Sequence, residues 1–253
     1  MSRTPRVVGL IPARLPSSRL PRKALVDICG LPMVMHVYHR CMMAASLDEV
    51  YVATDSAEIR QIVEAGGGRA IMTRSDHETG TDRIAEAALG LDCDVVVNIQ
   101  GDEALVRPEH IDVAVKGLLA DPQAEVVILV NSFRKYKSPA DIKVVLDEAG
   151  HVMYLSRSDI PSGERTPQPE MLKAYHVLPF RRSFLLEYAG WGKGRLERIE
   201  YIEHLRILER GRKIRAVKVD SSAVSVDTAD DLKFVRASMP TDPYFARYRD
   251  RCA

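Results

Sequence analysis

Four short, almost wholly apolar runs constrain the fold of this chain more than any other feature. They read RVVGLI (6–11), EVYVAT (49–54), DVVVNI (94–99) and EVVILV (125–130). Strands that are apolar on both faces are typical of a parallel sheet covered by helices on each side. Segments with helical periodicity lie between these runs. The alternation therefore predicts an α/β fold with a doubly wound, mostly parallel sheet.

The pattern changes after the fourth run. DIKVVLDEAGHVMYLSRS (141–158) predicts two strands around a turn, as in a β-hairpin, and GRLERIEYIEHLRILERG (194–211) predicts one long helix. We therefore expect a single domain, 1–253, with an antiparallel insertion inside an α/β core.

Composition argues against several classes of protein. The chain has 253 residues, with 36 Lys+Arg against 35 Asp+Glu, so it lacks the basic excess of a nucleic-acid-binding protein. Cys29, Cys41, Cys93 and Cys252 form no Cys-x-x-Cys pair, which favours reduced thiols in a cytoplasmic protein. No apolar run has the length of a signal peptide core or a membrane span, so we expect a cytoplasmic protein without a membrane partner.

One connecting loop is rich in cations although the net charge is only +1. The loop IPARLPSSRLPRKAL (11–25) follows the first strand and contains Arg14, Arg19, Arg22 and Lys23. Ligands of open α/β sheets bind at the carboxyl ends of strands, where such cations can neutralise a polyphosphate. The alternative is a solvated surface loop. Neither G-x-x-x-x-G-K-[ST] nor G-x-G-x-x-G is present, so the sequence supports neither a P-loop nor a dinucleotide fold.

Two aspartates follow other strands of the expected core. Asp102 lies in Gln-Gly-Asp-Glu after the most apolar strand, and Asp227 precedes a helix in VDTADDL. Each alone could be a strand-end turn or a helix cap. Together with the cationic loop, however, two carboxylates favour a site for Mg²⁺ and a nucleoside triphosphate.

These segments carry a resemblance to the CMP-KDO synthetase (3-deoxy-manno-octulosonate cytidylyltransferase) family. The similar motifs occur in order over residues 7–236: IPARLPSSRLPRKALVDICGLPMVMHV, VATD, MTRSDHETGTDR, VVNIQGDE, IKVVLD, LSRSDIP, LERIEYIEHLRILERG and VDTADDL. The resemblance implies a Rossmann-like fold of the nucleotide-diphospho-sugar transferase type, Mg²⁺ as cofactor, CTP as substrate and a homodimer. It further implies that 1–130 and 213–253 bind CTP, while 131–212 binds the acceptor and dimerises.

The resemblance also assigns roles to single residues. It implies catalysis by Lys23, Arg19, Asp102 and Asp227, with the two aspartates as Mg²⁺ ligands. CTP would be bound by Leu10, Pro12, Ala13, Arg14, Arg19, Lys23, Thr73, Arg74, Ser75, Gly80, Thr81 and Gln100. An acceptor oxygen would attack the α-phosphorus of CTP in line and release pyrophosphate, so no protein nucleophile is expected.

The acceptor segment departs from the family pattern. Members that use 3-deoxy-manno-octulosonate (KDO) carry Lys-His-Ile-Gly-x-Tyr-x-Tyr-Arg, and here Ala174, Leu178 and Phe180 stand at the histidine and tyrosine positions. The remaining acceptor candidates are Arg83, Gln100, Arg157, Tyr175, His176, Glu200, Glu203 and His204. Because sugar hydroxyls would lose partners, we expect a compact phosphonate such as phosphonoformate, as in relatives in phosphonate biosynthesis, with KDO as the alternative.

Two other functions compete with a cytidylyltransferase. A sugar-1-phosphate nucleotidyltransferase would carry a Gly-Gly-x-Gly-Thr loop, which this sequence lacks. A non-catalytic nucleotide-binding protein would not need both aspartates together with Arg19 and Lys23. We therefore favour an enzyme.

Overall fold

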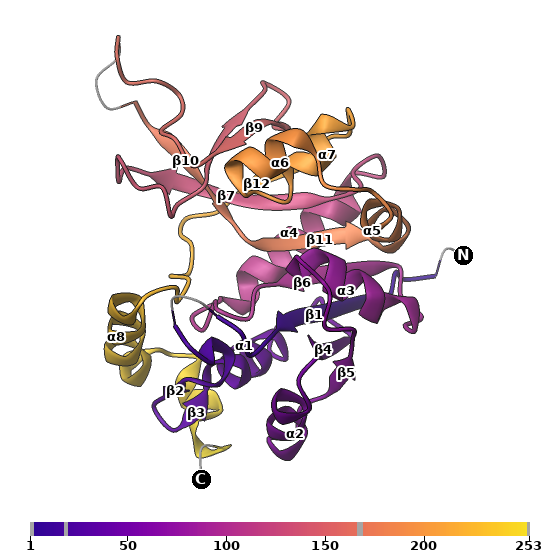
Figure 1. Cartoon of the computed structure of the whole chain (residues 1–253), viewed down its shortest axis with the longest axis vertical. Coiled ribbons are helices and arrows are strands. Elements are labelled where there is room, and N and C mark those ends of the chain that lie inside the picture. The colour runs from indigo at the N-terminus through magenta and orange to yellow at the C-terminus, as the bar shows by residue number, and fades with distance from the viewer. Residues whose placement is uncertain (1–2, 18–19, 166–168, 252–253) are drawn as a thin grey trace. The chain divides into compact units, whose positions relative to one another are not determined.

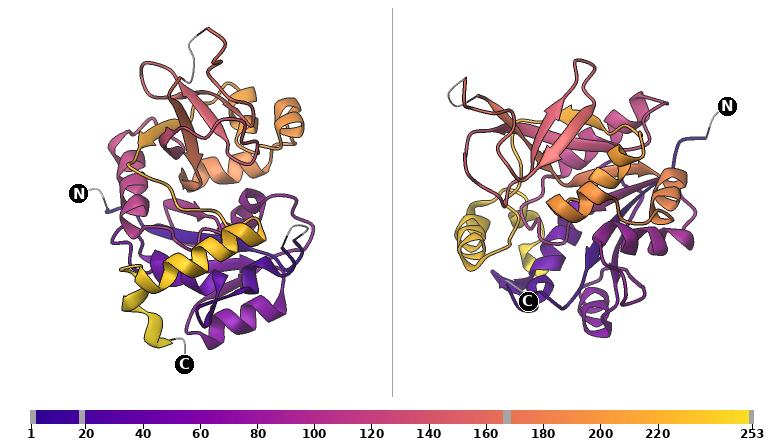
Figure 2. Two further views of the ribbon diagram at one scale, coloured as in Figure 1. Left: turned by 90° about the vertical axis from the view of Figure 1, so that its left-hand side faces the viewer. Right: turned by 45° about the horizontal axis from the view of Figure 1, so that its top comes forward.

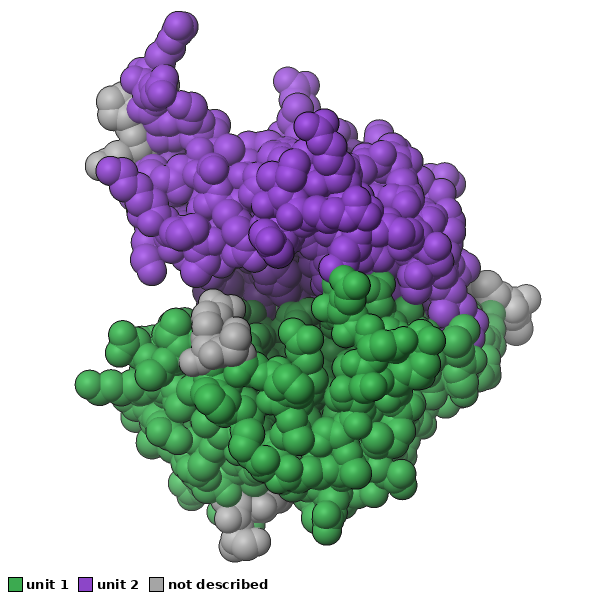
Figure 3. Space-filling view, in the orientation of Figure 1, with its two compact units in different colours: residues 1–112, 223–253 green, residues 113–222 purple. Residues whose placement is uncertain are grey.

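The protein is described here by a computed structural model that covers residues 3–17, 20–165 and 169–251 (Figures 1 and 2). The chain forms two compact units, coloured separately in Figure 3. The first unit comprises Met1–Asp112 and Ala223–Ala253, and the second comprises Val113–Ser222. The assignment of CTP to the core and of the acceptor to the insertion stays a prediction. No helix in the described ranges is long and apolar enough to cross a bilayer.

The first unit contains the parallel strands that the apolar runs predict. Neighbouring strands are all parallel, and in spatial order they are β6 (Val95–Ile99), β1 (Val7–Ala13), β4 (Glu49–Thr54) and β5 (Ala70–Met72). The connecting helices are α1 (Met33–Cys41), α2 (Ala57–Ala65) and α3 (Gly80–Leu89). Every residue of β6 is buried, as expected for a strand covered on both faces. The predicted α/β fold with a parallel sheet is confirmed.

Side-chain caps fix where the helices of this unit begin. The Ser56 hydroxyl accepts from the Ile59 N–H at the start of α2, and the Thr79 hydroxyl accepts from the Asp82 N–H at the start of α3. Each cap satisfies a backbone donor that has no partner inside its helix. The cap at Thr79 therefore sets the point at which the loop after β5 turns into α3.

The C-terminal part of the chain returns to the first unit. It consists of α8 (Ala229–Ser238) and the short helices η2 (Met239–Thr241), η3 (Phe245–Arg247) and η4 (Arg249–Arg251). In Figures 1 and 2, α8 lies beside the small hairpin of β2 (Asp27–Ile28) and β3 (Leu31–Pro32). There the Arg236 Nη2 donates to the Asp27 carbonyl at 2.7 Å.

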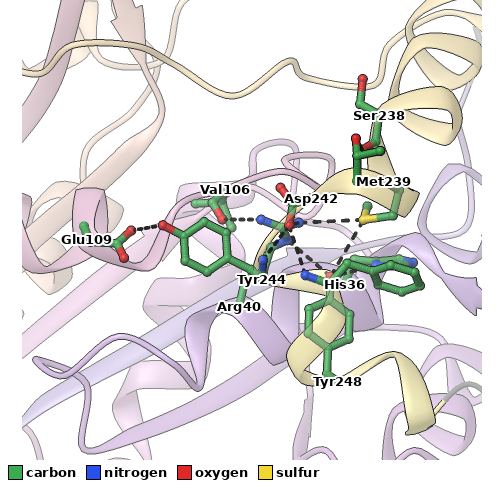
Figure 4. Close-up of polar contacts among 11 residues, drawn as sticks. His36, Arg40, Val106, Glu109, Ser238, Met239, Asp242, Tyr244 and Tyr248 are labelled. Atoms are coloured by element: carbon green, nitrogen blue, oxygen red, sulfur yellow. Dashed lines mark hydrogen bonds and ion pairs between the residues drawn. The ribbon is translucent and has the colours of Figure 1, made fainter.

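A buried arginine on α1 fastens this C-terminal segment (Figure 4). The Arg40 Nη2 donates to Asp242 Oδ1 at 2.6 Å, Nε donates to the Tyr248 hydroxyl at 3.2 Å, and Nη1 donates to the Val106 carbonyl at 3.3 Å. Arg40 is fully buried, and a buried charge is tolerated when it is paired and hydrogen-bonded. The His36 ring, which contacts the same Tyr248 hydroxyl, has its pKa lowered by burial to about 4.

The second unit is built on a mixed sheet of order β12-β7-β10-β8-β9. The strands of this sheet are β7 (Val127–Phe133), β8 (Lys143–Leu146), β9 (Val152–Ser156), β10 (Met171–Tyr175) and β12 (Arg215–Lys218). The unit also contains β11 (Val177–Arg181), which is not a strand of this sheet. Its helices are α5 (Arg182–Ala189), α6 (Arg195–Glu200) and α7 (Leu205–Glu209), and α4 (Pro108–Ala120) enters it from the first unit. The antiparallel pair β8–β9 confirms the predicted hairpin.

The prediction of one long helix over 194–211 is wrong. The helix breaks at Tyr201, whose φ of 55° lies in the left-handed region and ends α6. The Arg157 guanidinium binds the carbonyls at this break, with 2.9 Å from Nε to the Glu200 oxygen and 3.2 Å from Nη2 to the Tyr201 oxygen. These bonds occupy carbonyls that a continuous helix would pair with its own N–H groups.

Candidate active site

A pocket in the first unit lies where β1 and β6 end. Its described lining residues are Pro12, Ala13, Arg14, Pro16, Ser17, Lys23, Ala24, Met33, His77, Glu78, Thr79, Gly80, Arg83, Gln100, Gly101, Asp102 and Asp227. Ligands of open α/β sheets bind at this edge, where the carboxyl ends of parallel strands meet. The structure thus brings the cationic loop and both aspartates to a single pocket. Asp102 follows β6 as expected, but Asp227 does not stand at a strand end: the last strand before it, β12, ends at Lys218, and Asp227 directly precedes the N-cap of α8.

The charged centre of the pocket is one ammonium between two carboxylates. The Lys23 Nζ lies 2.6 Å from Asp102 Oδ2 and 3.0 Å from Asp227 Oδ1. Burial acts against the charge on Lys23, but the two carboxylates outweigh it and raise the pKa of the lysine. Lys23 is therefore a fixed cation at neutral pH.

Two adjacent contacts hold the carboxylates side by side although they are far apart in sequence. The Val226 N–H donates to the Asp102 carbonyl at 3.0 Å, and the Ser225 hydroxyl donates to Glu103 Oε1 at 2.6 Å. The segment before Asp227 is thereby attached to the turn after β6. The distance between the carboxylates thus depends on backbone contacts as well as on Lys23.

The carboxylate pair fits a magnesium ion. Carboxylate oxygens are the ligands that this hard cation takes from proteins. Within the ranges that the structure describes, no group of three or more His, Cys, Asp or Glu side chains is placed to hold a metal alone. A cation held by Asp102 and Asp227 would need further ligands from phosphate or water, and this is how Mg²⁺ usually binds with a nucleotide.

Glycine allows the ends of β1 and β6 to approach each other closely. A Cβ added to Gly101 would lie 2.8 Å from the Pro12 carbonyl oxygen, and one added to Gly80 would lie 3.1 Å from Pro12 Cγ. Contacts this short force the neighbouring atoms to move. Two glycines on other segments thus leave the space that Pro12, near the end of β1, occupies.

On the expectation that CTP binds in this pocket, substitution of Gly101 by alanine should displace the Pro12 backbone and raise KM for CTP about tenfold, at a cost of about 1–3 kcal/mol for overpacking. Steady-state pyrophosphate release against CTP concentration measures this change. Gly90→Ala is the matched control, because an added Cβ there meets nothing within 4 Å and Gly90 has a negative φ. Equal KM values for the two variants would show that the close approach has no part in nucleotide binding.

The residues expected to bind CTP fall into four groups in the structure. Pro12, Ala13, Arg14, Lys23, Gly80 and Gln100 line the pocket. Leu10 and Thr81 are buried, and the Thr81 hydroxyl accepts from Asn98 Nδ2 at 3.0 Å. Thr73, Arg74 and Ser75 belong to the loop before α3 but not to the pocket lining. Arg19 lies outside the described residues.

The residues expected to bind the acceptor are divided between the two units. Arg83 and Gln100 line the pocket of the first unit. In the second unit, the Arg157 guanidinium donates to protein carbonyls, including that of Pro139 at 3.0 Å from Nη1. The backbone N–H of Arg157 donates to Glu200 Oε2 at 3.0 Å. Arg157 and Glu200 therefore form one cluster, which holds the break between α6 and α7.

The other acceptor candidates also lie in the second unit. The rings of His176 and His204 stack with centroids 5.8 Å apart, and His204 Nε2 lies 3.7 Å from Glu203 Oε1. Burial lowers the pKa of His204 to about 4, so its ring is neutral at physiological pH. Tyr175 is buried as well. The role of these side chains toward an acceptor stays a prediction.

Several pocket residues were not among the sequence candidates. Pro16 and Ser17 belong to the cationic loop, and His77, Glu78 and Thr79 belong to MTRSDHETGTDR. Both segments were identified from the sequence. Which of their residues face the pocket depends on the turns of the backbone, and no residue pattern in the sequence indicates these.

Comparisons with known proteins give one consistent result. The family model described as cytidylyltransferase matches residues 8–214. The 3-deoxy-manno-octulosonate cytidylyltransferase of Trichlorobacter lovleyi is 41% identical over 248 residues, which are 92% of this chain and 98% of that protein. The protein of the same name from Escherichia coli is 39% identical over 236 residues, covering 92% and 96% respectively.

Solved structures extend the similarity to the fold. The structure of CMP:2-keto-3-deoxy-manno-octonic acid synthetase complexed with CTP matches with a TM-score of 0.89 and 39% identity, over 93% of this chain and 99% of that chain. A cytidylyltransferase from Leptospira borgpetersenii matches with a TM-score of 0.64 at 16% identity, over 94% and 88%. The second likeness shows only that the fold is shared.

The expectation of a phosphonate acceptor is wrong. The relatives, at 39% and 41% identity over nearly the whole chain, are named for 3-deoxy-manno-octulosonate. The expectation depended on His204 and on the apolar residues Ala174, Leu178 and Phe180, and the side chains of the three apolar residues are buried in β10 and β11. Phe180, for example, stacks on Phe184 with ring centroids 6.4 Å apart. Packing in the core accounts for the apolar character of these positions without any change of acceptor.

Proposed function

The chain belongs to the cytidylyltransferase family and is an enzyme, and from this premise we propose that it transfers CMP from CTP to KDO with release of pyrophosphate. The observation that carries the proposal is the meeting of Lys23, Asp102 and Asp227 in the pocket at the strand ends. The names of the relatives supply the acceptor.

The pocket residues suit transfer of a nucleotidyl group. An acceptor oxygen attacks the α-phosphorus while pyrophosphate leaves, so negative charge develops on the leaving group. Lys23 and Arg14 lie where they can neutralise this charge. Bound Mg²⁺ would be held by Asp102 and Asp227, and it would supply further electrostatic stabilisation of the phosphate oxygens. The loop before α3 is the proposed wall for the base and ribose. Its residues His77 to Gly80 line the pocket, and they belong to a different segment of the chain from the residues that follow β1 and β6.

We extend the proposal to a homodimer. The exposed large apolar side chains of the second unit include Met153 on β9 and Ile199 and Tyr201 at the end of α6. Ile199 and Tyr201 flank Glu200 at the end of α6, and the Glu200 carboxylate accepts from the Tyr154 hydroxyl of β9 at 3.4 Å. Exposed apolar surface of this kind often marks a subunit contact, and this supports the homodimer.

The acceptor and the nucleotide can be tested in one assay of pyrophosphate release. With Mg²⁺ and CTP, we expect kcat/KM for KDO to exceed that for phosphonoformate at least 100-fold, because a site made for sugar hydroxyls is left unpaired by an acceptor without them. With KDO fixed, CTP should be preferred over UTP and ATP. Equal rates with KDO and phosphonoformate, or with CTP and ATP, would contradict the proposed function.

A further inference from the structure

Two side chains on α3, Arg83 and Glu86, hold the loop that leads into this helix. Glu86 is the more exposed of the two side chains. Its Oε1 accepts from the Arg74 N–H at 3.1 Å, and its Oε2 accepts from Arg74 Nε at 3.3 Å and also contacts His77 Nε2. One carboxylate therefore binds the loop at two positions three residues apart.

Arg83 holds the same loop from inside. Its Nη1 donates to the Thr73 hydroxyl at 2.7 Å and to the Arg74 carbonyl at 3.3 Å, while Nη2 lies 3.4 Å from Asp55 Oδ2. Arg83 is buried, so these charged bonds are shielded from water. Arg74 is thus held through both its N–H and its carbonyl by side chains one helical turn apart.

The loop held in this way is a wall of the nucleotide pocket. His77, Glu78 and Thr79 line the pocket, whereas Glu86 does not. The side chains that suit a triphosphate, Lys23 and its two aspartates, come from other segments. The wall after His77 is therefore available for the nucleoside part of the ligand.

The charge state of Glu86 supports this role. Burial acts against the carboxylate, but the bonds from His77 and Arg74 outweigh it and lower the pKa of Glu86. Glu86 is therefore ionised at neutral pH and can accept from all its partners at once. A neutral amide of the same shape has only one acceptor oxygen and would replace the other by a donor.

We propose that Glu86 is a positioning residue that fixes the wall formed by the loop before α3 and thereby sets the selectivity for cytosine over uracil. This inference rests on the proposed function. The two bases differ at two adjacent positions of the edge: cytosine carries an amino donor at C4 and an acceptor at N3, whereas uracil carries a carbonyl acceptor at C4 and a donor at N3. A pocket distinguishes them only if its own polar groups are held in place, because an imperfectly placed group loses its hydrogen bond to either base.

Glu86→Gln tests the inference, with Glu64→Gln as the matched control. Glu64 accepts from Arg60 Nε at 2.8 Å on the surface of α2 and is not part of the pocket lining. For Glu86→Gln we expect KM for CTP to rise about tenfold and the ratio of kcat/KM for CTP to that for UTP to fall about tenfold. The KM for KDO and the kcat with CTP should stay within about twofold of the wild type. Glu64→Gln should behave as the wild type throughout.

The split between the two KM values separates positioning from general destabilisation. A variant that only loosened the fold would lower Tm without changing the preference for CTP, and an unchanged CTP:UTP ratio would overturn the inference. Should Glu86→Gln fail to fold, Arg74→Met decides, because it removes the bond from the exposed Arg74 side chain to Glu86, together with its ion pair with Asp76, and should shift the ratio in the same direction. A wild-type enzyme without preference for CTP would instead contradict the proposed function itself.

Discussion

Asparagine in place of Asp102 or Asp227 is expected to lower kcat on the order of 1,000-fold at saturating CTP and KDO. Each carboxylate lies within 3.0 Å of the Lys23 ammonium and fits the proposed magnesium site. An amide keeps the shape of the side chain but removes its charge, so a cation would face the triphosphate with one anionic protein ligand fewer. Binding of Mn²⁺ to the nucleotide-free protein, followed by electron paramagnetic resonance, should weaken in both variants.

Asp230→Asn is the matched control for these two variants. Asp230 is an exposed residue in the first turn of α8, close to Asp227 in sequence, and does not line the pocket. Its replacement should leave both kcat and Mn²⁺ binding near the wild-type values. If Asp227→Asn were to keep a wild-type kcat, the role of Asp227 would be limited to the start of α8.

The strands of the first unit and the location of the pocket could be predicted from the sequence because they follow from local patterns. DVVVNI has four apolar residues in six, and the strand that it forms, β6, is buried throughout. Parallel strands place their carboxyl ends at one edge, so polar residues after two such strands meet there. This is why the sequence alone places Lys23 and Asp102 together.

The break between α6 and α7 could not be predicted in this way. The sequence from 194 to 211 keeps a helical pattern through Tyr201. The contacts that stabilise the break come from Arg157, and no periodicity within the segment indicates a partner so distant in sequence. A side chain that competes for backbone carbonyls can thus end a helix where local propensity would continue it.

The acceptor was predicted wrongly for a related reason. The sequence shows that Leu178 and Phe180 replace polar residues of the family, but it does not show that both side chains are buried. A buried apolar residue reports first on packing. Glu86 illustrates the opposite case, since in TDRIAEAAL it has the character of an ordinary helix residue, and only the fold reveals its bonds to Arg74 and His77.

Replacement of Lys23 by methionine is expected to have two opposite effects. Turnover should fall at least 100-fold, because the ammonium that neutralises the triphosphate and the leaving pyrophosphate is lost while the length of the side chain is kept. Binding of Mn²⁺ in the absence of nucleotide should become tighter. In the wild type, the ammonium pairs with the carboxylates of Asp102 and Asp227 at 2.6 and 3.0 Å and competes with a metal ion for them. Pyrophosphate release and electron paramagnetic resonance measure the two effects separately.

The direction of the metal effect distinguishes two roles for Lys23. If the lysine served only to hold the two carboxylates in place, its loss would let them separate and would weaken Mn²⁺ binding. The contacts of Ser225 with Glu103 and of Val226 with Asp102 argue against this, since they join the two segments without Lys23. Lys233→Met, at an exposed position of α8, is the control for loss of a surface cation and should change neither quantity. Tighter Mn²⁺ binding together with slower turnover would therefore show that the Lys23 ammonium leaves the two carboxylates when the metal binds and neutralises the phosphates instead.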